Sequence, residues 1–423
     1  MIPINLGLLR REEQGKRPRR GKECPASRRW SWCSNFCLLP FAFCLLICSA
    51  SFSLAAERPH LITRWENYTT ANGMPDAKVF CITVDGARVW AGTEDGLVLI
   101  ENGKVAKVYK PADGLAHRVV MGIAVDPETG DLWIATFGGI SHFSGGQFEN
   151  FANLTSGLLN DICYGIAIQG NFVWVATTAG ISRYNKHTGE WTDWSEKNAP
   201  FHEPWTYGVV LAPEIGKVYF AMWGGGLIEY DNQVGYMKAY TDPDEQMEIV
   251  LFKNQGLIHI IVSNVAWNPD TKMVWASTYF GLSGYDGRNW HNYLTKDSGL
   301  ASDFINAPKS RRNEVWACTD KGLSMLDYST NTWVSYRPGK QKSQGEIDIT
   351  WPDGKKEKLA TPTALAHNYI LNMDFQGEDI WVATALGLSH GIREPQKETQ
   401  LYAKANISRR TGNFAPGYSQ KSH

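Results

Sequence analysis

Past residue 60 the chain alternates short apolar stretches with turns, and one pattern recurs seven times. Each copy has an aromatic residue, a small residue two positions on, Thr in all but one copy, two or more variable residues, Gly, and then Leu or Ile. The copies begin at Trp90, Trp133, Trp174, Tyr219, Trp275, Trp316 and Trp381. They are 43, 41, 45, 56, 41 and 65 residues apart. A period near 41–45 residues, built of strand-like units, is typical of propeller blades with four strands each.

The second copy indicates how one repeat forms four strands. An alternating apolar segment at 119–126 predicts the innermost strand, and residues 131–135 predict the second strand after a turn. Gly139 can supply the positive φ of a tight hairpin before a third strand at 140–143. A fourth, outer strand with paired aromatic residues follows at 148–151. The repeated Trp is expected to pack between neighbouring blades.

The two ends of the repeated region predict how a ring of blades closes. Residues 65–68 carry the outer-strand pattern but precede the first inner strand, and the last repeat ends after its third strand near Ile392. We therefore predict an all-β, seven-bladed β-propeller of four-stranded blades over residues 60–392. The ring is expected to be closed by the N-terminal outer strand, which leaves no open sheet edge. Residues 393–423 are polar and are expected to form a loose tail.

Two spacings exceed the common period and place insertions at 241–255 and 337–363. Both fall in connections from an outer strand to the next inner strand. Within the second, Asp353-Gly354 is a dipeptide typical of tight turns, so a small hairpin is predicted over 344–360. Two interpretations stay open for the insertions: surface loops without a function, or a lid or partner contact.

The first 55 residues have the pattern of a secretory signal peptide. Residues 1–35 contain nine Lys and Arg, and an apolar run from Phe36 to Ile47 follows them. Ser53 and Ala55 then suit cleavage after Ala55. An uncleaved anchor is the alternative, because the apolar run is nearly long enough to span a membrane. Cleavage would place the mature chain in the periplasm or outside the cell, without a membrane span.

Composition and charge agree with an exported, turn-rich protein. The chain has 423 residues, of which 43% are apolar and 40 are Gly. Its formal charge is −1, and it becomes −7 without residues 1–55, which argues against a nucleic-acid partner. Three cysteines would remain, and each lies in an apolar stretch, so buried thiols are predicted rather than a disulfide framework. They are Cys81, Cys163 and Cys318.

The Trp-x-Ala-Thr-x-x-Gly-Leu/Ile-Ser pattern, with a further Gly-Leu before each inner strand, resembles the two-component regulator propeller repeat. The resemblance covers roughly residues 60–392. Members of that family form the extracellular sensing part of hybrid histidine-kinase regulators, so the resemblance implies a sensor-like propeller that binds a ligand. These 423 residues carry no kinase or DNA-binding segment, which puts direct signalling in doubt and implies a separate signalling partner. More distantly, the repeats resemble the seven-bladed antibiotic-inactivating lyases, whose metal-assisted site uses His and Glu on one face.

A Gly-Leu element before the inner strands indicates where a site is expected, because this connection reaches the mouth of a propeller's central channel. It is Gly-Met in the first copy, Ala-Pro in the fourth and Ala-Leu in the seventh. The residue three positions beyond its first member is, in successive copies, Asp76, His117, Asn160, His202, His259, Ser302 and His367. Four of the ten His thus share one repeat position. The next position adds charged or amide residues, namely Arg118, Asp161, Glu203, Asp303 and Asn368.

Two interpretations compete for these residues. In the first, polar residues at loop ends cap strands and hydrogen-bond neighbouring blades. In the second, imidazoles and carboxylates ring the channel mouth and hold an anionic ligand or a divalent metal ion. The candidate ligand-binding residues are His117, Arg118, Asp161, His202, Glu203, His259, Asp303 and His367, and the four His are the candidate metal ligands. The sequence specifies no particular cofactor.

The favoured function is an exported propeller that binds a small molecule, a glycan or a protein at one face. The alternative is a metal-assisted lyase or hydrolase that uses the ring of His and acidic residues. No catalytic residue is assigned, because the chain contains no Gly-x-Ser-x-Gly, His-Glu-x-x-His or phosphate-loop motif.

Overall fold

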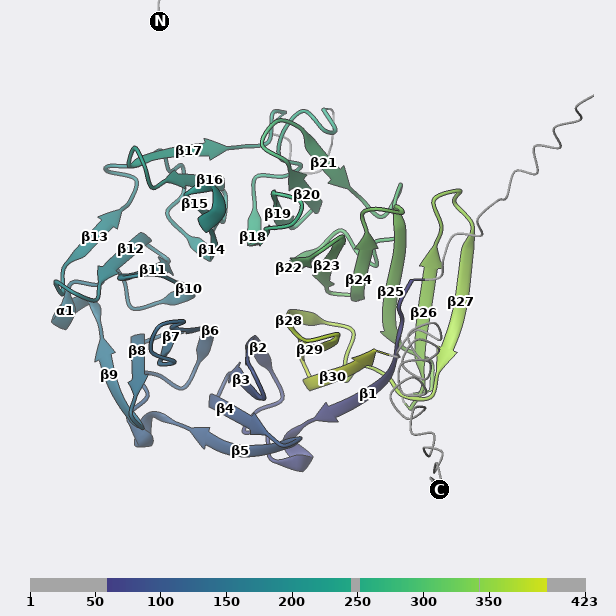
Figure 1. The fold of residues 1–423 in the computed structure, drawn as a ribbon, viewed down its shortest axis with the longest axis horizontal. Helices are drawn as coiled ribbons and strands as arrows, with labels where there is room; N and C mark the ends of the chain where they lie inside the picture. Colours follow the sequence, from purple (N-terminus) through teal and green to yellow (C-terminus); the bar gives the residue numbers. More distant parts are fainter. Residues whose placement is uncertain (1–58, 245–251, 342, 394–423) are drawn as a thin grey trace, which may run out of the picture. The chain divides into compact units, whose positions relative to one another are not determined.

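The computed structural model describes residues 59–244, 252–341 and 343–393. The predicted signal peptide, and all but the first residue of the predicted tail, lie outside these described residues. The described residues form seven antiparallel sheets arranged as a ring (Figure 1). Among them, no helix is both long enough and apolar enough to cross a membrane.

Each sheet is one blade, and its strands follow one another from the inside of the ring to the outside. Blades one and two comprise β2 (Val79–Asp85), β3 (Arg88–Thr93), β4 (Gly96–Glu101), β5 (Lys104–Tyr109), then β6 (Val120–Val125), β7 (Leu132–Thr136), β8 (Gly139–Ser144) and β9 (Gln147–Phe151). Blades three and four comprise β10 (Cys163–Gln169), β11 (Phe172–Thr177), β12 (Gly180–Asn185), β13 (Trp191–Trp194), then β14 (Thr206–Ala212), β15 (Lys217–Met222), β16 (Gly226–Asp231) and β17 (Tyr236–Tyr240).

The remaining three blades complete the ring. Blades five and six comprise β18 (Val262–Asn268), β19 (Met273–Thr278), β20 (Gly281–Tyr285), β21 (Trp290–Tyr293), then β22 (Ile305–Arg311), β23 (Glu314–Thr319), β24 (Gly322–Asp327), β25 (Thr332–Pro338), β26 (Gly345–Thr350) and β27 (Lys356–Thr361). Blade seven comprises β28 (Ile370–Gln376), β29 (Asp379–Thr384), β30 (Gly387–Arg393) and β1 (Ile62–Tyr68). The helical segments are single turns, such as α1 (Asn153–Ser156).

The innermost strands of successive blades contact one another all the way round. These strands are β2, β6, β10, β14, β18, β22 and β28, and β28 contacts β2 again. The predicted all-β, seven-bladed propeller is therefore confirmed.

The repeated Trp residues pack between blades, as predicted. Each lies in a hydrophobic cluster drawn from two neighbouring sheets; for example, Trp133 of β7 shares a cluster with Val173 of β11. Trp174 lies 5.0 Å, ring centre to ring centre, from Tyr230 in the next blade. All six repeated Trp are at most 4% exposed. Because a large flat ring fills the space between two twisted sheets, its recurrence sets the spacing of the blades.

Two small residues of the repeat fasten the turns on one face of the ring. Thr93 donates a hydrogen bond to the carbonyl of Gly96 (2.8 Å) and accepts the N–H of Asp95 (3.1 Å), which closes the turn between β3 and β4. The N–H of Gly96 then donates to the carbonyl of Arg118 (2.7 Å), in the connection to the next blade. These turns and the connections between blades therefore share one face, which we call the connection face.

In five of the seven blades, a Ser in the third strand holds the preceding connection against its own sheet. Ser141 accepts the N–H of Ala116 (3.0 Å) and donates to Asn150 (2.6 Å), whose amide donates to the carbonyl of Gly114 (2.8 Å). Ser389 plays the same part in blade seven. The start of such an inner strand is thus held by its own blade, and the turn of the blade before it adds a further hydrogen bond.

The second insertion forms the predicted hairpin, with a turn at 351–355 in which Gly354 has a φ of 84°. It does not lie over the connection face. Instead, β26 pairs with β25, so the hairpin adds two strands to the four predicted strands of blade six (Figure 1). The reason is apolar alternation, because Ile347 and Ile349 are buried in the same cluster as Trp316.

Strand β1 lies at the outer edge of blade seven. It pairs with β30, with Trp65 opposite Gly391. It is also anchored to blade six, because the N–H of Ile62 donates to the Tyr336 hydroxyl (3.3 Å) and the N–H of Trp65 donates to Thr363 (2.7 Å). The first described strand therefore joins the last blade to the blade before it.

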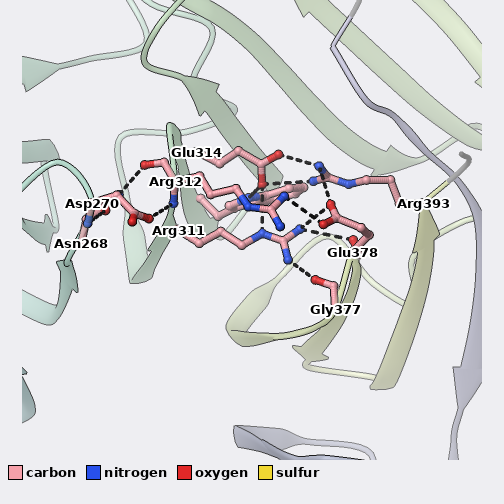
Figure 2. Close-up of polar contacts among 9 residues, drawn as sticks. Asn268, Asp270, Arg311, Arg312, Glu314, Gly377, Glu378 and Arg393 are labelled. Carbon is pink, nitrogen blue, oxygen red and sulfur yellow. Dashed lines mark hydrogen bonds and ion pairs between the residues drawn. The ribbon is translucent and has the colours of Figure 1, made fainter. Parts of the chain in front are cut away.

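Arg393, placed in the tail by the sequence analysis, is the last residue of β30. Its guanidinium donates to both carboxylate oxygens of Glu314 at 2.5 and 3.1 Å, and its side chain is 4% exposed. Figure 2 shows Arg311 beside the same carboxylate, from which it reaches the backbone of Gly377 and Glu378 in blade seven. This network joins blades six and seven on the face opposite the connection face.

The network keeps Glu314 ionised. Burial by itself raises the pKa of this carboxyl, but the hydrogen bonds and charge of Arg393, with help from Trp316 and Arg311, lower it below its ordinary value. A depressed folded-state pKa contributes stability above the unfolded pKa of about 4.3, and that stability is lost as the pH falls through the folded pKa.

We predict that Glu314→Ala lowers the free energy of unfolding by about 3–5 kcal/mol at pH 7, because it leaves the buried Arg393 without its partner. The gap from wild type should narrow below pH 4. Urea unfolding measures both effects. Arg64→Ala, which removes an exposed ion pair with Glu66, is the control and should cost less than about 1 kcal/mol. Equal losses in the two variants would contradict the prediction.

Candidate functional site

Every inner strand departs from regular pairing at its second residue. The register with the next strand shifts at this point in all seven blades, which is the mark of a β-bulge. A bulge leaves one residue out of the ladder and redirects its side chain. The seven residues, which we call the bulge ring, are Phe80, Met121, Tyr164, Tyr207, Ser263, Asn306 and Leu371.

The bulge ring lines one cavity of about 230 Å³ at the channel mouth on the connection face. Three further residues, Asn264, Tyr279 and Asn372, complete its lining. None of these lining residues carries a charge at neutral pH. All seven members of the bulge ring are partly exposed, so their side chains are accessible from the cavity.

The cavity has two chemically different sides. Blades one to four contribute the apolar and aromatic members of the bulge ring. Blades five to seven contribute Ser263 and Asn306, together with Asn264 and Asn372. On this side Leu371 is the one apolar member of the bulge ring, and Tyr279 adds one aromatic ring. A ligand in this cavity would therefore meet mainly apolar and aromatic groups on one side and mainly amide and hydroxyl groups on the other.

The aromatic side is held in place by ring contacts. Tyr164 meets Tyr207 edge-on at 4.9 Å, and Phe137 of the adjoining turn meets Tyr164 at 5.5 Å and 76°. Burial, and then the neighbouring Tyr279 and Tyr164, raise the pKa of Tyr207 above its ordinary value. Its hydroxyl therefore stays protonated at neutral pH and can donate a hydrogen bond.

A second cavity of about 210 Å³ follows the inner strands below the mouth. Glycines in blades two to four allow those strands to approach closely, because a Cβ on Gly165 would lie 3.1 Å from the Cα of Gly208, and one on Gly208 would lie 2.4 Å from the Asn264 side chain. Lys309 and Asp374 form an ion pair at 3.0 Å between blades six and seven. The uncharged mouth thus lies above a tighter channel that contains this ion pair.

The structure assigns a local role to three of the predicted site histidines. The Nδ1 atoms of His117, His259 and His367 accept the N–H of the residue two positions on, at 3.1, 3.1 and 3.0 Å. In other blades the same bond is accepted by Asp76, Asn160 and Ser302. His, Asp, Asn and Ser are thus equivalent at this repeat position, which matches the capping interpretation.

The other predicted residues lie on the connection face, spread over several blades. Arg118 donates to the Glu94 carbonyl (3.1 Å), Asp161 accepts the Asn153 N–H (2.6 Å), and Asp303 accepts the N–H and hydroxyl of Thr295 (2.6 and 2.9 Å). His202 and Glu203 are exposed. None of the eight predicted residues lines either channel cavity.

No metal-ligand set comes together from these side chains. Across residues 59–244, 252–341 and 343–393, no group of three or more His, Cys, Asp and Glu side chains could hold a metal ion. The three cysteines are buried and free, as predicted, and burial raises the pKa of the Cys81 thiol to about 12. They are therefore protonated at neutral pH.

The sequence analysis missed the bulge ring. Its signal was the second residue of each inner strand, where aromatic residues occur in three of the first four blades, at Phe80, Tyr164 and Tyr207. In a single sequence, uncharged residues at this position do not distinguish a ligand-binding role from a packing role.

Comparison with known proteins supports the fold. No family model and no curated protein matches the chain. Among solved structures, it is similar to the extracellular domain of a proposed one component system from B. thetaiotaomicron, with 16% identity and a TM-score of 0.59 over 78% of this chain and 40% of that one. It is also similar to the extracellular domain of a proposed hybrid two component system from the same organism, with 16% identity and a TM-score of 0.51 over 79% of this chain and 53% of that one.

A third similar structure is virginiamycin B lyase from Staphylococcus aureus, with 13% identity and a TM-score of 0.53 over 78% of this chain and 99% of that one. At such low identities these likenesses establish the propeller fold alone. The chain also spans only about half or less of the two sensor-domain structures. The similar structures nevertheless include extracellular domains of two-component systems, the group that the repeat resembles.

We predict that His117→Ala lowers the free energy of unfolding by about 0.5–1.5 kcal/mol, because the N–H of Val119 loses its acceptor. His117→Asn should be nearly neutral, since Asn160 makes the same bond in blade three. Urea unfolding of both variants tests the capping role. Equal destabilisation by Asn and Ala would count against it.

Proposed function

We propose that this chain is an exported, sensor-like binding propeller whose ligand occupies the bulge-ring cavity. The observation that supports this most is that the bulge residues of all seven inner strands line the same cavity. Regular pairing would be more stable locally, and bulges are over-represented next to functional sites. The proposal keeps the ligand at the channel mouth but moves its contacts from the eight polar residues to the bulge ring.

The chemistry of the lining favours a small, neutral ligand or the uncharged end of a larger one. Aromatic rings on one side suit an apolar face, and amide and hydroxyl groups on the other suit hydrogen bonds. The lining contains no charged residue that would compensate a charged ligand. Among the predicted partners, a small molecule or a glycan end fits a cavity of about 230 Å³ better than a protein surface does.

The sensor-like role is supported by the similar structures, two of which are described as extracellular domains of signalling systems. We propose that a separate partner would transmit the signal. The alternative, a metal-assisted lyase or hydrolase, would use His and acidic side chains. Since the described residues bring no set of three such side chains together, we favour binding.

We predict that Tyr164→Ala weakens ligand binding about thirtyfold, because truncation of an aromatic anchor in a binding pocket costs about 2 kcal/mol. A thermal-shift screen of neutral oligosaccharides and other neutral small molecules identifies the ligand, and titration calorimetry measures its affinity. Tyr236→Ala, at a Tyr that is 65% exposed on an outer strand, is the matched control and should bind normally.

A ligand that binds the two variants equally well would place its site elsewhere. A ligand whose binding depends on an added divalent ion and is abolished by His117→Ala would instead favour the ring of polar residues and the enzyme alternative.

For the exported form we predict cleavage after Ala55. Expression of the full chain with its own leader in a Gram-negative host should yield a periplasmic or secreted protein whose N-terminus is Ala56. Edman sequencing or intact mass measures this directly. Recovery of the uncut chain in the membrane fraction would favour the anchor interpretation of the apolar run.

A further inference from the structure

A larger cavity lies outside the channel, on the outer wall of the ring. Its volume is about 470 Å³, more than twice that of either channel cavity. One side is formed by the outer strand of blade five with His291 and Tyr293, and the other by the hairpin of blade six with Trp351 and Lys356. We call this cavity the outer cleft. Its volume falls in the range of small-molecule sites.

Both insertions contribute to the outer cleft. The end of the first supplies Lys253 and Asn254, and the hairpin turn of the second supplies Trp351, Pro352 and Gly354. These two segments are the main departures from the repeat period, and they lie nearly 100 residues apart in the sequence. Other blades lack such segments, so the outer cleft belongs to blades five and six alone.

The outer cleft carries an excess of positive charge. Three lysines line it, Lys253, Lys296 and Lys356, and Asp297 is its one carboxylate. Lys253 forms an ion pair with Asp297. Lys296 and Lys356 are exposed and form no ion pair with any described residue. The cleft is therefore positively charged although the formal charge of the whole chain is −1, and it would attract an anionic ligand.

The uncharged lining adds hydrogen-bonding groups and an aromatic ring. Asn331 and Thr350 contribute amide and hydroxyl groups, and the partly exposed Tyr293 contributes an aromatic ring. Trp351 also lines the cleft but packs against the core cluster of blade six. The hairpin that carries Thr350 and Trp351 is fixed to blade six, because Thr350 pairs with the buried Trp333 across the strands. The cleft therefore has a rigid wall, which limits the entropy lost on binding.

We propose that the outer cleft binds an acidic saccharide, with its carboxylate or sulfate groups at Lys296 and Lys356. The unpaired lysines select for negative charge, the amide and hydroxyl groups suit sugar hydroxyls, and Tyr293 offers an aromatic edge for a sugar ring. This site is separate from the uncharged bulge-ring cavity and goes beyond the function proposed for it.

Titration calorimetry in 50 mM NaCl with trigalacturonate, and separately with a heparin-derived disaccharide, tests the proposal and distinguishes carboxylate from sulfate. At least one probe should bind, and more weakly in 300 mM NaCl. The double variant Lys296→Gln, Lys356→Gln should lose affinity at least about tenfold, because it removes two charge-assisted contacts. Lys104→Gln with Lys197→Gln changes the same charge at exposed positions outside the cleft and should bind as wild type does.

Four results would overturn the proposal. These are failure of both acidic probes to bind, equal binding of neutral galactotriose, equal binding of inorganic sulfate alone, and unchanged affinity in the Lys296 and Lys356 double variant. Because Tyr164→Ala should leave this binding intact, failure at the outer cleft and failure at the bulge ring are distinguishable.

Discussion

Closure of the ring is the constraint on which the other features depend. A propeller blade cannot bury both of its faces alone, so each needs a neighbour on either side. Here the final blade takes its outer strand, β1, from the other end of the repeated region, and Ile62 and Trp65 bond to blade six as well. The Arg393–Glu314 pair fastens the same junction on the face opposite the connection face (Figure 2). Both sets of contacts hold blade seven, which contains the first and last described strands, against blade six.

A closed ring also determines what the channel mouth can be. Each inner strand begins where a connection ends. In five blades the Ser of the same blade holds that connection, and the turn of the blade before also bonds to it, as Gly96 does to Arg118. The seven inner strands therefore bring seven equivalent residues to one opening. The repeat therefore defines the position, while the residue at that position is free to differ. The difference between the aromatic side and the amide side of the mouth arises from that freedom.

Much of the fold could be predicted because it depends on local, repeated signals. The aromatic residue of each second strand, the Gly of each hairpin and the Asp353-Gly354 turn each follow from spacing and backbone preference. The edge pairing of β26 could not be predicted from spacing, although the alternation of Ile347 and Ile349 indicated a strand with one buried face. Pairing with β25 depends on a tertiary cluster that one sequence does not display.

The candidate site was harder to predict, for a physical reason. The four histidines were candidates because imidazole can bind metals and anions. In three of them, however, Nδ1 accepts a hydrogen bond from the backbone N–H two residues further along the chain, and Asp76 and Ser302 accept the same bond in other blades. A bulge, by contrast, is a property of pairing between strands and leaves no titratable residue as its signal. From the sequence, Phe80 and Tyr164 would be assigned to the core, because residue type alone does not indicate whether a side chain faces a neighbouring blade or the channel.

The position of the hairpin follows from the same geometry. The inner strands of a closed ring leave no room for additional strands, whereas the outer edge of a blade can be extended without disturbing closure. Strands β26 and β27 extend that edge, and the cavity they form lies against the outer strand of the neighbouring blade rather than in the channel. The two cavities also differ in charge. Unpaired lysines at the channel mouth would repel one another across the opening, whereas lysines on the outer wall are exposed to solvent, which screens their charges. An uncharged mouth and a cationic outer cleft are therefore compatible within one ring, and each can change without altering the other.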